Sequence, residues 1–199
     1  RRGIGFGVVI SGNPTASVVR CMSDDYRDPT SMKTIVYTNS KTSAMGSLTK
    51  AFENMLEKSE ASWRAMGNDD FIPGRVISFT GDDGLQSKVH IMRAWAHNYD
   101  DGDHIDDDLP NLLIMPATKA ADCGVSSNSC RRSYRVGLAS NFYCVVQEMG
   151  RVDRVPLGDD GDAALNRYEV HLSFNCAVKL FTRIMQHPEK SERDLQLED

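Results

Sequence analysis

The sequence lacks the long apolar runs and the paired cysteines that define several classes of protein. No stretch approaches the roughly 18 consecutive apolar residues of a membrane-spanning helix, so we expect no membrane partner. The amino-terminal residues lack the apolar core of a signal peptide, which argues against secretion. The five cysteines are odd in number and form no C-x-x-C pair, which favours a reducing compartment over a disulfide framework or a zinc site.

The motifs of self-contained hydrolases are also missing. The dipeptide Gly-Lys never occurs, so the chain has no P-loop of the form G-x-x-x-x-G-K-[ST], and neither G-x-S-x-G nor H-E-x-x-H is present. The early glycines Gly3, Gly5 and Gly7 fail the dinucleotide-binding spacing, because Val8 stands where the third glycine belongs. We interpret that segment as a flexible lead into the chain. A complete hydrolase with its own nucleophile is therefore not expected.

Negative charge is concentrated in two segments. The net charge is −5, and six aspartates lie between Asp100 and Asp108. An acidic loop insertion near residues 97–110 and a polar acidic tail at 187–199 therefore carry the excess, which leaves room for a local basic face. An alternative is a metal site built from His97, His104 and the aspartates. The glycine does not stand where an EF-hand calcium loop needs it, so we expect a solvated loop and no metal site.

Short apolar runs alternate with helical spacing along the chain. Runs at residues 6–10 and 18–22 flank the turn cluster Gly12-Asn13-Pro14 and predict two strands. Further strands are expected at 34–37, 75–79, 111–115, 134–138 and 168–172. Residues 57–72 are polar and predict a loop or a short helix anchored by Trp63.

The helices expected between these strands follow from apolar residues at a spacing of three and four. A helix after the run at 134–138 is expected to begin at a Ser140 cap. The positions predicted to face inward are Met45, Leu48, Phe52, Met55 and Leu56; Leu85, Val89, Met92 and Ala96; Phe142, Val145, Val146 and Met149; and Ala177, Leu180, Phe181, Ile184 and Met185.

This alternation predicts an α/β fold, with a mainly parallel sheet and helices on both faces, over a single domain at residues 1–186. In such sheets ligands collect at the carboxyl ends of the strands. The turns after Tyr37, Phe79 and Met115 are polar, and we expect them, together with the loop holding Arg151 and Arg154, to lie at that edge. Threonine, asparagine, glycine and arginine there suit the binding of phosphates.

Four segments, in this order, resemble the second RecA-like domain of superfamily 2 helicases, with the RecQ-like branch closest. They read I-V-Y-T-N-S at 35–40, F-T-G-D at 79–82, I-M-P-A-T-K-A-A-D-C-G-V at 114–125 and Q-E-M-G-R-V-D-R at 147–154. The resemblance covers roughly residues 30–186 and rests mainly on the last segment and on the shared order. It implies a three-layer RecA-like domain, preceded in the family by an ATP-binding lobe whose P-loop this sequence does not contain.

The resemblance assigns roles in ATP use. Gln147, Arg151 and Arg154 match the family motif Q-x-x-G-R-x-G-R, whose last arginine acts as a finger on the γ-phosphate of ATP. Arg154 and Arg151 are therefore the implied catalytic residues. The implied contacts to ATP are these two arginines together with Gln147 and Gly124. Gly124 keeps a close turn beside the nucleotide. ATP with Mg²⁺ is itself held mainly by the preceding lobe.

The resemblance also assigns contacts to nucleic acid, single-stranded or duplex and first of all DNA. Asn39, Ser40, Gly81 and Thr118 match positions that touch the sugar-phosphate backbone of the tracked strand. A basic cluster of Arg131, Arg132 and Arg135 offers an extra contact or, equally well, a solvated start of a strand. The family implies a nuclear location, or otherwise a cytoplasmic one.

Two residues depart from the family pattern. Asp153 stands where the last motif has glycine, and Asp122 replaces a small residue in the third segment. A carboxylate beside Arg151 and Arg154 can hold one of them in an ion pair, or can merely cap a turn. A degenerate, non-catalytic helicase-fold scaffold is therefore the alternative, while a nucleotide-binding domain of a metabolic enzyme has no fingerprint here. We expect the chain by itself to have no ATPase activity.

Overall fold

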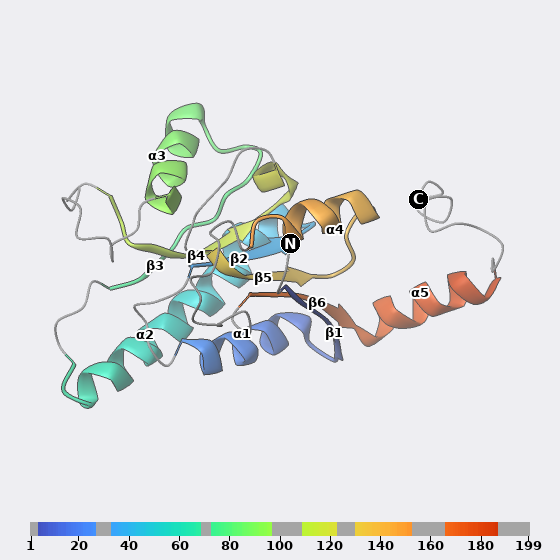
Figure 1. Ribbon diagram of the computed structural model, residues 1–199, viewed down its shortest axis with the longest axis horizontal. Coiled ribbons are helices and arrows are strands. Elements are labelled where there is room, and N and C mark those ends of the chain that lie inside the picture. Colours follow the sequence, from blue (N-terminus) through green and yellow to red (C-terminus); the bar gives the residue numbers. More distant parts are fainter. Residues whose placement is uncertain are drawn as a thin grey trace.

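Six parallel strands form one sheet in the order β1-β6-β5-β2-β4-β3 (Figure 1). The computed structural model describes residues 4–26, 33–68, 73–96, 109–122, 130–152 and 166–186. The strands are β1 (Gly5–Ser11), β2 (Lys33–Thr38), β3 (Arg75–Val76), β4 (Leu112–Ala117), β5 (Cys130–Val136) and β6 (Arg167–Ser173).

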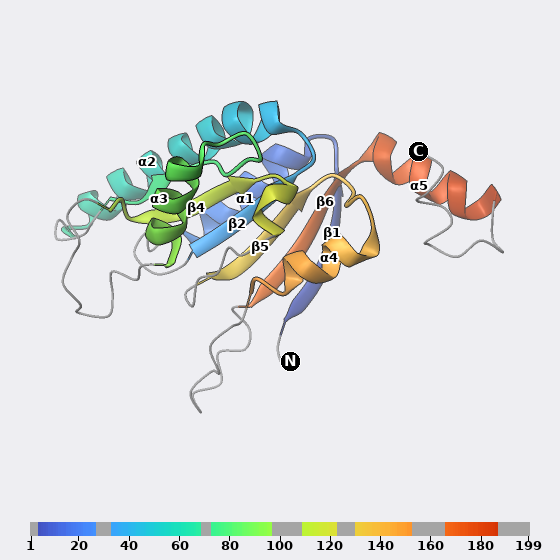
Figure 2. The same ribbon diagram turned by 90° about the horizontal axis from the view of Figure 1, so that it is seen from above.

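The helices cover both faces of the sheet, with α1 and α2 on one side and α3 and α4 on the other (Figure 1, Figure 2). Their bounds are α1 (Pro14–Asp25), α2 (Thr49–Ala65), α3 (Leu85–Ala96), α4 (Phe142–Met149) and α5 (Phe174–Gln186). A π-helical turn η1 (Ser43–Leu48) precedes α2, and a 3-10 turn η3 (Lys119–Asp122) follows β4. The predicted three-layer α/β fold with a parallel sheet is confirmed.

The middle of the sheet is buried on both faces. Every residue of β2 and of β4 is buried, as expected for continuous apolar runs in a parallel sheet covered by helices. β4 extends through Pro116, which the sequence suggested as its boundary, and β5 begins at Cys130, earlier than expected. By contrast β3 is only two residues long, and Phe79 joins the sheet by a single bridge to Ala117.

In the amino-terminal segment the predicted strand at residues 6–10 is confirmed as part of β1, whereas the other two predictions are wrong. Residues 18–22 lie in α1 and not in a strand, because Asn13 caps this helix by accepting a hydrogen bond from the Ala16 amide (3.1 Å) and Pro14 is its first residue. Gly5 and Gly7 are not a flexible lead but part of β1, which pairs with β6 along its whole length. An Asn-Pro pair is common both in turns and at helix starts, so this pair alone does not distinguish the two structures.

Three helices present other faces than the sequence predicted. On α3 the buried residues are Ile91, Ala94 and Trp95, whereas Leu85, Val89, Met92 and Ala96 are exposed. On α4 the cap is Asn141 and not Ser140, and Phe142 and Val146 are exposed. Val145 and Met149 pack against the β6 core as predicted. α5 extends away from the sheet (Figure 1), so Phe181, Ile184 and Met185 lie at the surface and only Ala177 is buried.

Of the remaining predictions some are correct, the inward position of Met45 and the loop or short helix from residue 57 are wrong, and others are untested. Leu48, Phe52, Met55 and Leu56 are buried as expected, Met45 is exposed, and α2 continues as a helix to Ala65 with Trp63 half-buried. Most of the acidic insertion and the whole tail lie outside the described residues, and so does the proposed metal set with His97 and His104. Among the described residues no helix is long and apolar enough to cross a membrane.

Candidate functional site

The polar turns predicted to bind phosphates do meet at one edge of the sheet. Tyr37 of β2 pairs with Ala117 of β4, so the turns that follow these strands are neighbours. Phe79 bridges to the same Ala117, and its carbonyl accepts a hydrogen bond from the Thr118 amide (3.1 Å). This carboxyl edge therefore brings together Asn39 and Ser40, Gly81, and Thr118, as the sequence predicted.

Within this edge Ser40 begins a helical turn. The Ser40 hydroxyl accepts a hydrogen bond from the Ser43 amide (3.1 Å), and the Ser40 carbonyl accepts one from the Ala44 amide (2.9 Å). Ser40 therefore caps the helical segment that continues through η1 into α2. The amino-terminal end of that helical segment carries a partial positive charge and lies at the turn that would bind phosphate.

Two lysines contact the Gly81 turn. Lys41, at the start of this segment, forms an ion pair with Asp82, and the Lys88 ammonium of α3 donates a hydrogen bond to the Gly81 carbonyl (2.7 Å). Lys41 is exposed and Lys88 is half-buried. Lys41, which the sequence reasoning did not select, is the cation nearest in sequence to Asn39 and Ser40.

Asn39 is held by the protein itself. Its amide nitrogen donates to the Leu138 carbonyl (2.8 Å), and its amide oxygen accepts from the Arg135 guanidinium. The same guanidinium donates to the Leu138 carbonyl (3.1 Å) and forms an ion pair with Glu148 of α4. Asn39 thus positions the turn after β2 and has less freedom to contact a ligand than the motif suggested.

The basic cluster is not a surface patch. Arg132 and Arg135 are 6% and 4% exposed, and Arg131 is only half-buried. The reason is the early start of β5, which places all three residues inside a strand of the sheet. The prediction of an outward-facing cluster is therefore wrong for Arg132 and Arg135. Arg131 is the one of the three with part of its surface exposed.

Glu148 joins α4 to two strands. Its carboxylate pairs with Arg135 of β5 and accepts a hydrogen bond from the Tyr168 hydroxyl of β6 (2.8 Å), and it is 1% exposed. A buried carboxylate needs such partners because its desolvation is costly. The sequence analysis gave Glu148 no role. Glu148 is four residues from both Cys144 and Val152, which is the spacing of one helical face, and a charged residue on an apolar face is a signal of a buried ion pair.

The described part of the arginine motif, with Gln147 and Arg151, lies toward the opposite edge of the sheet from the phosphate turns. Because α4 connects the parallel strands β5 and β6, it must run back against them, and its end points toward the amino edge (Figure 2). Gln147 and Arg151 are half-buried near this end, and the Arg151 amide donates to the Glu148 carbonyl (3.1 Å). The expectation that Arg151 lies at the carboxyl edge is therefore wrong, while the same expectation for Arg154 falls outside the described residues.

Several predicted site residues lie outside the described part of the chain. These are Arg154, Asp153 and Gly124, and the side chain of Asp122. The arginine finger and the effect of both aspartates stay predictions.

Two solved structures share this fold. The Mss116p DEAD-box helicase domain 2 bound to an RNA duplex matches 94% of this chain and 61% of that chain, with a TM-score of 0.53 and 9% sequence identity. The same helicase bound to ssRNA and UDP-BeF matches 96% of this chain and 31% of that chain, with a TM-score of 0.60 and 14% identity. The likeness shows an α/β RecA-like fold, and the chain spans less than two thirds of either structure. No family model and no curated protein matches the chain.

Proposed function

We propose that this chain is the carboxyl-terminal motor lobe of an ATP-dependent nucleic-acid helicase or translocase. One observation carries the proposal: in a sheet with the fold of helicase domain 2, the turns holding Ser40, Gly81 and Thr118 lie side by side at one edge. Backbone amides, hydroxyls and a capped helix start are groups that bind phosphates without reading bases. This edge would hold the sugar-phosphate backbone of a strand.

The separation of the two motifs supports a division of labour in this lobe. The phosphate turns lie at the carboxyl edge, whereas α4 carries Gln147 and Arg151 toward the amino edge. ATP with Mg²⁺ would be held mainly by a preceding RecA-like lobe that carries a P-loop. From this lobe Gln147, Gly124, Arg151 and Arg154 would approach the nucleotide, with Arg154 as the finger on the γ-phosphate.

Binding of nucleic acid tests the carboxyl edge directly. We expect Lys41→Ala and Thr118→Ala each to weaken binding of the chain to a labelled oligonucleotide, by about tenfold for the charged contact. Lys58→Ala is the matched control, because it removes the same charge from exposed α2 away from this edge. Fluorescence anisotropy at fixed salt measures the affinities. Equal affinities for Lys41→Ala and Lys58→Ala would contradict the assignment of this edge.

The same assay addresses the kind of nucleic acid. DNA as the substrate, like the RecQ-like branch and a nuclear location, stays a prediction of the motif resemblance. Single-stranded and duplex DNA and RNA of one sequence are compared, and tighter binding of DNA is the expected result.

The arginine finger is tested in a protein that contains both lobes. Arg154→Ala should slow nucleic-acid-stimulated ATP hydrolysis by about 10³-fold, because the finger stabilises charge that develops only in the transition state. Arg93→Ala, which removes an exposed arginine from α3, should leave the rate unchanged. A rate for Arg154→Ala equal to that of the control would remove Arg154 from the reaction.

A second candidate function is a non-catalytic scaffold that keeps the helicase fold. Asp153 in place of the motif glycine and Asp122 in place of a small residue favour it. In the two-lobe protein, Asp153→Gly should then create ATPase activity that the native protein lacks. If the native two-lobe protein already hydrolyses ATP, the motor assignment stands and the scaffold is rejected.

A further inference from the structure

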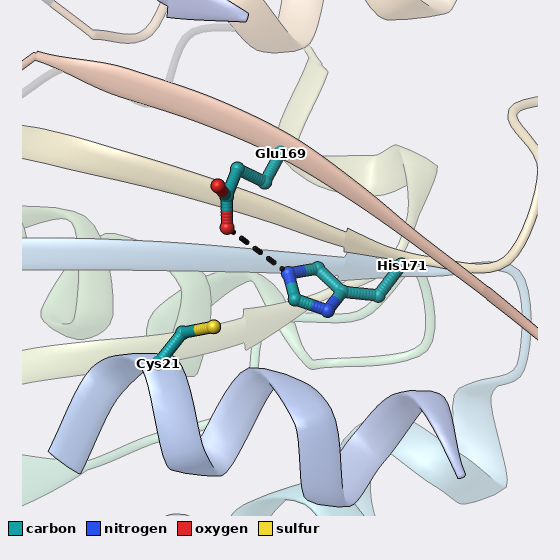
Figure 3. Close-up of side chains that lie close together, drawn as sticks. All are labelled: Cys21, Glu169 and His171. Carbon is teal, nitrogen blue, oxygen red and sulfur yellow. Dashed lines mark hydrogen bonds and ion pairs between the residues drawn. The ribbon is translucent and has the colours of Figure 1, made fainter. Parts of the chain in front are cut away.

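Polar side chains meet where α1 packs on β6, away from both edges discussed above. Ser17 and Cys21 lie one turn apart on α1, and Glu169 and His171 are alternate residues of β6 and so face the same side of the sheet. Figure 3 shows Cys21, Glu169 and His171 pointing toward one another. Glu169 and His171 are 2% and 0% exposed, and Cys21 is half-buried.

The three donor atoms lie close enough together to form a candidate metal-binding set. The Cys21 sulfur, a Glu169 carboxylate oxygen and a His171 ring nitrogen all lie within 4.8 Å of one another. His171 Nε2 is 3.2 Å from Glu169 Oε2. In a tetrahedral zinc site the donors are about 3.3 to 3.8 Å apart, given the usual bond lengths. The nitrogen and oxygen already have nearly this spacing, and a shift of about 1 Å would bring in the sulfur.

The surroundings hold these ligands in place. His171 Nδ1 is 3.1 Å from the Ser17 hydroxyl, the kind of outer contact that orients a metal-binding imidazole. Burial lowers the pKa of His171, so the ring is neutral and has a lone pair to donate. The other carboxylate oxygen of Glu169 pairs with Arg167. Across the strand pair, Gly7 leaves room, because a Cβ there would lie 3.1 Å from that oxygen.

Charge and donor type select the kind of ion. A thiolate and a carboxylate bring two negative charges into a largely buried place, and the half-exposed Arg167 balances only one of them, so a cation is favoured there. One sulfur, one nitrogen and one oxygen donor suit a borderline-soft ion such as zinc and not magnesium or calcium. The order Ser17, His171, Glu169 also resembles the serine, histidine and carboxylate of a hydrolase. Ser17 is only 4% exposed, however, and it does not line the pocket between α1 and α2 that contains Val19, Ser23 and Lys58, so a metal site fits this cluster better.

We propose that Cys21, Glu169 and His171 bind a single zinc-class metal ion that joins α1 to β6, with water at the fourth position. The sequence predicted no metal site, because the three ligands come from two distant segments and form no motif. Such a site would stabilise the packing of α1 on the sheet, since the metal binds the folded chain in preference to the unfolded one.

Cobalt substitution tests the site without any activity assay. The chain, freed of metal with EDTA and dialysed, is titrated with CoCl₂, and the thiolate-to-cobalt charge-transfer absorption is recorded. We expect one equivalent to bind and ZnCl₂ to displace it. Cys21→Ser should abolish the absorption, whereas Cys176→Ser, which removes another half-buried cysteine outside the cluster, should keep it. Glu169→Gln should weaken cobalt binding at least about tenfold.

Two further measurements separate ligand loss from misfolding. Circular dichroism in EDTA reports whether each variant is folded, and ZnCl₂ should raise the melting temperature of the wild type and of Cys176→Ser only. Absence of the charge-transfer absorption in the wild type, or its persistence in Cys21→Ser, would overturn the proposal. If Cys21→Ser does not fold, Glu169→Gln decides, because unchanged cobalt affinity in that variant would equally exclude the site.

Discussion

Arg135 and Glu148 show how one buried ion pair organises several segments. Arg135 joins Glu148, Asn39 and the Leu138 carbonyl, and Glu148 also bonds Tyr168. Buried Arg135 therefore bonds both the turn after β2, through Asn39, and α4, through Glu148. We infer that the pair orients both parts of the proposed lobe.

Removal of the Glu148 carboxylate should be costly. Glu148→Ala leaves the buried Arg135 guanidinium uncompensated, so we expect a loss of about 3 to 5 kcal/mol in the free energy of unfolding, measured by urea denaturation. Asp82→Ala breaks the exposed ion pair with Lys41 and should cost less than about 1 kcal/mol. Equal losses in the free energy of unfolding for the two variants would show that burial does not determine how much each ion pair contributes to stability.

Two glycines should respond to alanine with opposite signs. A Cβ at Gly74 would lie 2.4 Å from the Leu113 Cδ1 atom in the core, so Gly74→Ala should destabilise the protein by about 1 to 3 kcal/mol. Gly46 lies in η1, and no atom beyond its own helical turn and chain neighbours lies within 4 Å of the added carbon, so alanine there should stabilise by about 0.5 to 1 kcal/mol. Thermal unfolding measures both. A stabilising Gly74→Ala would mean that Leu113 moves at no cost.

At the scale of elements, helix starts are set locally but helix faces are not. Asn13 and Asn141 each cap a helix with their side-chain oxygen, and both contacts follow from chain chemistry within three residues. The buried face of α3 instead depends on where the sheet lies, which places Trp95 and Ile91 inward and Leu85 outward. Apolar spacing predicted that a helix forms here, but several apolar stripes were available for burial.

The cap of α1 can be tested by a single substitution. Asn13→Ala removes the acceptor for the Ala16 amide and should lower the free energy of unfolding by about 1 kcal/mol. Asn54→Ala, at an exposed position inside α2, should be neutral or slightly stabilising because alanine has the higher helix propensity. Urea denaturation compares the two. A cost as large for Asn54→Ala as for Asn13→Ala would remove the cap as the cause.

For the whole molecule, the absent P-loop makes a direct prediction about activity. The purified chain with MgATP and a single-stranded oligonucleotide should release no phosphate above a heat-denatured sample, because no group here can hold the nucleotide phosphates as that loop does. Release of phosphate is followed in a coupled assay. Turnover that Arg154→Ala does not reduce would point to another nucleotide site and contradict the proposed lobe.

Most of the alternation of strands and helices, and with it the parallel sheet and the shared edge of Ser40, Gly81 and Thr118, can be predicted from the amino-acid order, although residues 18–22 form a helix and not a strand. These features follow from local apolar patterns and from the rule that parallel strands end at one edge. The folded chain was needed to show that Arg151 lies toward the other edge, that Arg132 and Arg135 are buried, and that Cys21 meets Glu169 and His171. Those contacts join residues from segments far apart in the chain, and no local pattern encodes which distant side chains will meet.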